Sequence, residues 1–101
     1  MSNSITQEDY NKIEQLVTNA LSASSKAQAE LYLQRLSFIR STGGYTGYIA
    51  TVLSSLVSST SNAAGRVKDK ERKEYFANTD LCKLKGLIRD EADGGNGNGT
   101  D

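Results

Sequence analysis

Apolar side chains recur at every third or fourth position from residue 10 onward, which is the spacing of one face of an α-helix. Thr6 precedes this stretch and is a suitable N-cap, because its hydroxyl can accept a hydrogen bond from the amide near Asp9. The polar and acidic residues after Thr6 also suit the positive end of a helix dipole. We therefore predict a first helix that ends near Ser22. Its apolar positions are Tyr10, Ile13, Val17, Ala20 and Leu21.

A second helical pattern follows a short serine-rich break. Ser25 and Gln28 have the spacing of a capping box, and Gly43-Gly44 is typical of a helix C-terminus. The apolar stripe between them is unusually wide, which predicts that this helix makes contacts on two sides, against other helices or a second subunit. The stripe consists of Ala29, Tyr32, Leu33, Leu36 and Ile39, widened by Leu31 and Phe38.

Residues 41–65 contain no charged side chain. The part 48–53 has the β-branched and aromatic content of a strand. However, helical spacing continues as far as Val67 without an internal turn signal, and a strand of that length would be unusual. We therefore predict a helix, which continues through Gly65 into the following charged run and ends near Phe76.

The last apolar pattern lies close to the C-terminus. Asn78, Thr79 and Asp80 predict a break and a new cap, and a short helix follows them. Gly86 inside this helix lowers its stability by about 1 kcal/mol relative to alanine. The apolar stripe of the helix consists of Leu81, Leu84, Leu87 and Ile88.

These patterns predict an all-α protein, a small antiparallel bundle of three to four helices. The chain of 101 residues has the length of a single domain and contains no proline, the commonest breaker of helix interiors. Residues 92–101 are mostly glycine, asparagine and aspartate and cannot form a core. We therefore assign residues 1–91 to the bundle and residues 92–101 to a disordered tail.

The composition excludes several kinds of chemistry. The chain has no histidine, so the usual Cys-His and Ser-His nucleophilic systems are excluded. Cys82 is the single cysteine, which excludes an internal disulfide and any multi-cysteine zinc site. The glycines of residues 43–48 lack the lysine of a phosphate-binding loop. We predict no catalytic residue, no cofactor and no metal, and a protein that is not an enzyme.

The chain carries twelve basic and twelve acidic residues, but they are unevenly placed, and residues 66–74 are almost all charged. The bases of this run could contact a polyanion such as nucleic acid. Acidic residues interleave with them, and on a helix Asp69 would pair with Lys73 and Lys68 with Glu71. We therefore favour a solvated, self-paired helix face and keep a nucleic-acid-binding regulator as an alternative. The candidate polyanion contacts are Arg66, Lys68, Lys70, Arg72 and Lys73.

The uncharged segment also raises the question of a membrane. A spanning helix needs about 20 mainly apolar residues, and the many serine and threonine hydroxyls of residues 41–65 make insertion poor. A small membrane-associated effector is therefore only a second alternative. The amino terminus lacks the basic and apolar regions of a secretory signal. With a single cysteine, this predicts a cytoplasmic location.

The function that best fits these features is that of a non-enzymatic protein-interaction module, such as a regulator or an assembly factor. The wide apolar stripe of the second helix carries this expectation, and it makes a homodimer plausible. Tyrosine is favoured at interfaces, although a core position suits Tyr48 better. The predicted partner interface consists of Leu31, Tyr32, Phe38, Tyr45 and Tyr48.

Overall fold

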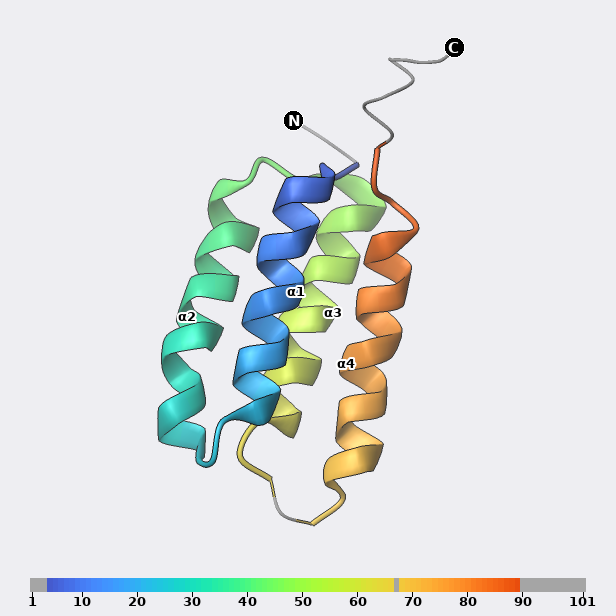
Figure 1. Ribbon diagram of the computed structural model, residues 1–101. Helices are drawn as coiled ribbons and strands as arrows, with labels where there is room; N and C mark the ends of the chain where they lie inside the picture. Colours follow the sequence, from blue (N-terminus) through green and yellow to red (C-terminus); the bar gives the residue numbers. More distant parts are fainter. Residues whose placement is uncertain (1–3, 67, 90–101) are drawn as a thin grey trace.

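Four helices run up and down and form an antiparallel bundle in the computed structural model, which describes residues 4–66 and 68–89 (Figure 1). All four helices contribute to the main hydrophobic core, and a smaller buried cluster contains Ala20, Ala29, Leu33 and Ala64, so the predicted all-α bundle is confirmed. The assigned tail, residues 92–101, lies outside the described residues, as does Val67, and the domain boundary stays a prediction. The helices are α1 (Gln7–Ser22), α2 (Lys26–Thr42), α3 (Gly47–Ala63) and α4 (Lys70–Lys85).

The two pairs of diagonally opposite helices in the bundle differ in their separation. Helices α1 and α3 contact each other and both remaining helices, whereas α2 and α4 do not contact each other among the described residues. Figure 1 shows α2 and α4 on opposite sides of the α1–α3 pair. Each outer helix therefore leaves a large part of its surface uncovered. The largest fully buried side chains include Ile13, Val17, Leu36, Ile49, Leu53, Leu56 and Leu84.

The predicted starts of the first two helices are confirmed by their caps. The Asp9 amide donates to Thr6 Oγ1 at 3.1 Å, and the Gln28 amide donates to Ser25 Oγ at the same distance. In return, Gln28 Oε1 accepts from the Ser24 amide at 2.9 Å, one residue earlier than in a standard capping box. These bonds satisfy amides that have no partner within their own helix.

The predicted continuous helix through Gly65 to Phe76 is wrong. Helix α3 ends at Ala63, and Gly65 and Asp69 have left-handed backbones with φ of 75° and 59°. Gly65 lies so close to α2 that a Cβ atom there would be 2.5 Å from the backbone nitrogen of Lys26. The chain turns at this point because the bundle returns on itself, although no strong turn signal precedes Gly65.

The predicted break at residues 78–80 is also wrong, because these residues lie inside α4. Their polar side chains find partners that keep the helix intact. Thr79 Oγ1 donates to the Tyr75 carbonyl at 2.8 Å, and the Asp80 carboxylate accepts bonds from α3. Gly86 is the C-cap of α4 and does not lie within a helix.

A backbone contact that the sequence did not predict ties the two ends of the described chain together. The Ile5 amide donates to the Leu87 carbonyl at 3.1 Å, and the Arg89 amide donates to the Ile5 carbonyl at 2.7 Å. Ile5 and Ile88 thus form a parallel bridge, and Ile5 is buried in the core. This contact closes one end of the bundle.

Candidate functional site: the α1–α2 groove

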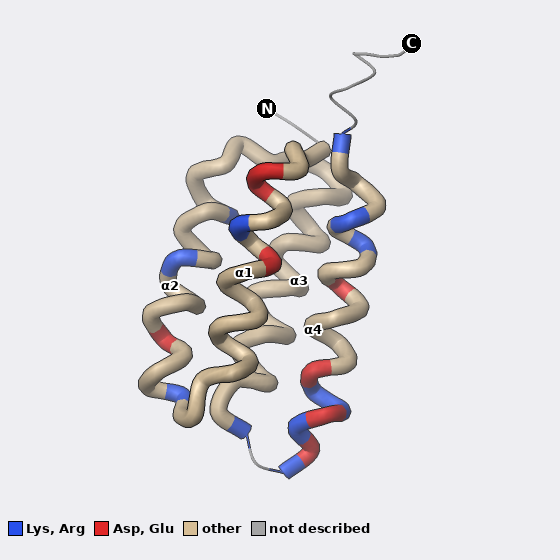
Figure 2. The backbone as a smooth tube through the Cα atoms, in the orientation of Figure 1, with Lys and Arg blue, Asp and Glu red and all other residues tan. Residues whose placement is uncertain are grey.

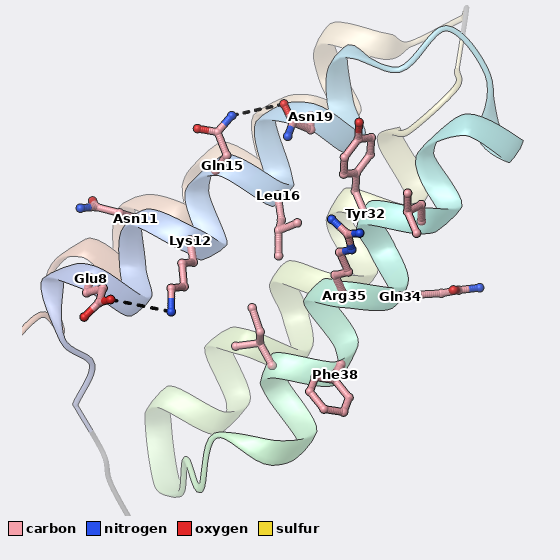
Figure 3. Close-up of a pocket in the computed structure, with 12 residues that line it drawn as sticks. Glu8, Asn11, Lys12, Gln15, Leu16, Asn19, Tyr32, Gln34, Arg35 and Phe38 are labelled. Atoms are coloured by element: carbon pink, nitrogen blue, oxygen red, sulfur yellow. Dashed lines mark hydrogen bonds and ion pairs between the residues drawn. The ribbon is translucent and has the colours of Figure 1, made fainter.

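A groove of about 790 Å³ runs between the outer surfaces of α1 and α2 (Figure 3). It lies on the side of the two helices opposite the faces that carry their buried residues. We call it the α1–α2 groove. It is lined by Glu8, Asn11, Lys12, Gln15, Leu16, Asn19, Leu31, Tyr32, Gln34, Arg35, Phe38 and Ile39.

The groove is apolar at its base and along one edge. Leu16 and Ile39 are partly buried and pack against the core, so they form a base that the bundle holds in place. Leu31 and Phe38 keep 51% and 67% of their surfaces exposed. Figure 3 shows Phe38 at the outer edge of α2, away from the helices behind it. Covering these side chains would remove a substantial apolar area from water.

The exposure of Leu31 and Phe38 follows from the helical register of α2. Ala29, Leu33 and Leu36 take the face toward the core. Leu31 and Phe38 are seven residues apart and therefore lie two turns from each other on one face, away from the core. The residues that widen the stripe thus lie on an exposed face of α2, and a contact made by this face stays a prediction.

The α1 wall of the groove is polar but largely uncharged. Side-chain amides follow one another at four-residue spacing, and Gln15 Nε2 donates to Asn19 Oδ1 at 3.3 Å. About two turns earlier, Gln7 Nε2 donates to Asn11 Oδ1 at 2.9 Å. Such amides can donate and accept hydrogen bonds at the edge of an apolar contact without imposing a charge.

Of the three charged residues that line the groove, two form an ion pair with each other and one does not. Glu8 Oε2 and Lys12 Nζ are 3.9 Å apart and form an exposed ion pair on α1, which is drawn as a dashed line in Figure 3. Arg35 on α2 forms no ion pair with any residue of the described chain. The remaining lining residues are uncharged.

The structure brings most of the predicted partner interface together. Leu31, Tyr32 and Phe38 all line the α1–α2 groove, and Tyr45 lines a smaller pocket of about 200 Å³ that also contains Phe38. The Tyr45 hydroxyl donates to Asp9 Oδ2 at 3.4 Å. Burial, and then the negative charge of Asp9 and the hydrogen bond to it, raise the pKa of Tyr45 above its ordinary value of 10.0.

Tyr48 stands apart from this group. It lies on α3, lines neither of these two pockets and keeps 58% of its surface exposed. The core position expected for Tyr48 is therefore wrong, because its neighbour Ile49 is the residue that faces the core. Tyr48 is useful as a control, since it is an exposed aromatic residue outside the α1–α2 groove.

The charged run does not form a uniformly basic surface. Lys70 Nζ lies 3.7 Å from Glu74 Oε2 and donates to the Leu21 carbonyl at 3.1 Å. Figure 2 shows basic and acidic residues alternating along the start of α4.

The helical ion pairs expected within the charged run do not form. Lys68 and Asp69 precede α4, which begins at Lys70, and neither side chain forms an ion pair with Glu71 or Lys73. Arg66 Nε instead donates to the Lys68 carbonyl at 3.3 Å. Contact of Arg66, Lys68, Lys70, Arg72 and Lys73 with a polyanion stays a prediction.

A second polar cluster, which the sequence did not predict, lies between α3 and α4. Asp80 is 6% exposed, and its Oδ2 accepts from Ser55 Oγ at 2.8 Å and from Ser59 Oγ at 3.0 Å. Ser55 and Ser59 are one turn apart, a spacing that could have indicated a shared partner. These two bonds connect α3 with α4. Among the described residues no group of three or more potential metal ligands occurs.

No protein-family model, curated protein or solved structure matches this chain. Within residues 4–66 and 68–89, no helix combines the length and the apolar character that crossing a bilayer requires. The geometry of the α1–α2 groove is therefore the main basis for a proposal about function.

Proposed function

We propose that this protein is a non-enzymatic interaction module that binds an amphipathic helix of a partner protein in the α1–α2 groove. The observation that carries the proposal is the exposure of Leu31 and Phe38 beside an apolar base. Complete burial of such a side chain contributes about 1.5–3 kcal/mol. Because each is already partly covered, we expect about 1–2 kcal/mol from each on binding. A cytoplasmic regulator or assembly factor would act through contacts of this kind.

The dimensions of the surface support a single helix as the occupant. Helices α1 and α2 have 16 and 17 residues and are therefore about 25 Å long. Two helices about 10 Å apart present a face of roughly 500 Å². A stable protein–protein interface buries about 800 Å² on each partner. The face is thus small for a globular partner but matches the helix-in-groove mode of recognition.

A second copy of the chain fits this surface less well. An antiparallel α2–α2 contact centred between Leu31 and Phe38 would place Gln34 and Arg35 of the two copies opposite each other. The two guanidinium groups would then approach across the contact, and like charges in that position destabilise it. The homodimer expected from the sequence therefore stays a prediction, and we treat it as an outcome of the test.

The test uses the full chain and a fluorescein-labelled 18-residue helical peptide with one leucine stripe and glutamine and alanine elsewhere. We expect saturable binding by fluorescence anisotropy. Leu31→Asp and Phe38→Asp should each weaken it at least tenfold, about 1.4 kcal/mol, because each would place a charge in the apolar contact. Circular dichroism should show unchanged folding, since both side chains are largely exposed.

Tyr48→Asp is the matched control, because it introduces the same charge at an exposed aromatic residue outside the groove. Its affinity for the peptide should equal that of the wild type. Absence of binding, or equal weakening by Tyr48→Asp, would contradict the proposal. Sedimentation of the wild type tests whether the chain dimerises through the groove. A dimer that Phe38→Asp converts to monomers would show that the groove binds another copy of the chain.

A further inference from the structure

We infer that the partner helix is acidic and that Arg35 selects it by binding a carboxylate beside the apolar contact. This inference rests on the proposed function and specifies the partner's chemistry. Three charged residues line the α1–α2 groove, Glu8, Lys12 and Arg35. Of these three, only Arg35 forms no ion pair with a described residue. The groove therefore presents a net positive charge to whatever occupies it.

Arg35 is placed where a bound helix would meet it. On the surface of α2, Leu31 is four residues before Arg35 and Phe38 is three residues after it, so the three side chains are neighbours. A helix that covers Leu31 and Phe38 must pass over Arg35. Its guanidinium offers several N–H donors in a plane that matches a carboxylate. A carboxylate about one turn from the apolar anchors of the partner would thus reach Arg35.

The surroundings of Arg35 strengthen this preference. Lys12 also faces the groove, so a basic helix would meet two cations and one carboxylate, that of Glu8. Asn11, Gln15 and Asn19 are neutral and neither neutralise nor repel an incoming acid. Displacement of water by the apolar contact lowers the local dielectric constant, which strengthens the attraction between opposite charges. Repulsion of basic helices adds to the selectivity.

The experiment compares three peptides that share one leucine stripe and differ only in the residues flanking it, which are all Glu, all Gln or all Lys. We expect the Glu peptide to bind the wild-type chain at least fivefold more tightly than the Gln peptide, and the Lys peptide to bind most weakly. The advantage of the Glu peptide should shrink as salt rises from about 0.05 to 0.5 M, because salt screens partly exposed charges.

Arg35→Gln should remove the preference for Glu over Gln and leave affinity for the Gln peptide within about twofold. Arg35→Glu should make the Lys peptide the tightest of the three. Arg40→Gln is the control, because Arg40 is an exposed arginine of the same helix that does not line the groove. It should keep the wild-type preference.

The possible results separate the two proposals. If the Glu and Gln peptides bind equally, or if Arg35→Gln keeps the preference, the acidic partner is refuted while the groove remains a helix-binding site. If none of the three peptides binds, both proposals fail. If the wild type is a dimer that Phe38→Asp disperses, a second copy occupies the groove and the acidic partner is again refuted.

Discussion

The Asp80 cluster allows a quantitative test of the contact between α3 and α4. Asp80 is almost fully buried, and the hydroxyls of Ser55 and Ser59 are the donors that its Oδ2 atom has within the described residues. A buried carboxylate that loses its donors keeps its desolvation cost without compensation. We therefore predict that Ser55→Ala and Ser59→Ala destabilise the bundle, although alanine is the better helix former.

The magnitude follows from two opposing contributions. A hydrogen bond to a charged group contributes about 1.5–3 kcal/mol, and we take about 1.5 kcal/mol for each because the two bonds share one oxygen. Replacing serine by alanine in a helix stabilises the helix by about 0.5 kcal/mol. Each single substitution should therefore cost about 1 kcal/mol. The double substitution should cost about 3 kcal/mol or more, because it leaves the carboxylate with neither donor.

The assay is a double-mutant cycle with Asp80→Ala, measured by urea unfolding. In the Asp80→Ala background, Ser59→Ala should be neutral or slightly stabilising, since the serine then has no carboxylate to bind. The expected coupling between Asp80 and Ser59 is about 1.5 kcal/mol. In the wild-type background, a loss of about 1 kcal/mol lowers the Tm of a domain of this size by roughly 4–8 °C.

Ser58→Ala is the matched control, because Ser58 is an exposed serine of α3 for which no hydrogen bond occurs within the described chain. It should change stability by less than about 0.5 kcal/mol. Coupling between Asp80 and Ser59 below about 0.3 kcal/mol would refute the reasoning, because independent sites add to within that amount. Equal effects of Ser58→Ala and Ser59→Ala would refute it as well.

Three further predictions concern other parts of the bundle. Thr60 Oγ1 is buried without a hydrogen-bond partner in the described residues, so Thr60→Val should raise the free energy of unfolding by about 1 kcal/mol in urea, and a loss would contradict this. Gly65→Ala should lower the free energy of unfolding by more than about 2 kcal/mol, because φ is 75° and the new Cβ would meet Lys26. Gly44→Ala is the control: φ is 71° there, but the new Cβ would have open space, so the loss should be only about 1 kcal/mol. The pKa of Tyr45 is raised in the folded state, so the stability that the protonated Tyr45 contributes is complete below pH of about 10. That stability is lost as the pH rises through the pKa of the folded state. Tyr45→Phe should lessen this alkaline loss of stability, and equal pH profiles would contradict the assignment.

The sequence predicted the first two helices well because their boundaries depend on contacts within a few residues. Thr6 and Ser25 cap amides only three positions away, and these bonds form as predicted. The apolar spacing of α1 also places its core face correctly, since a helix buries whichever stripe is apolar. Where local signals agree with one another, they suffice to predict a helix.

The second half of the chain was harder because its polar residues act across the bundle. Asp80 has the residue type of a cap, but its partners Ser55 and Ser59 lie on another helix. Gly65 breaks the helix at a close approach to α2, which no local pattern reports. The pairing of Ile5 with Ile88 joins opposite ends of the described chain and has no local signal either.

For the candidate site, the order of residues alone reveals that α2 carries more apolar side chains than a single contact face needs. Which of these side chains are covered depends on how the four helices pack. The bundle buries Ala29, Leu33 and Leu36 and leaves Leu31 and Phe38 exposed on the face that also carries Arg35. The physical reason is that helical periodicity is a local property, whereas burial depends on the other helices that pack against each face.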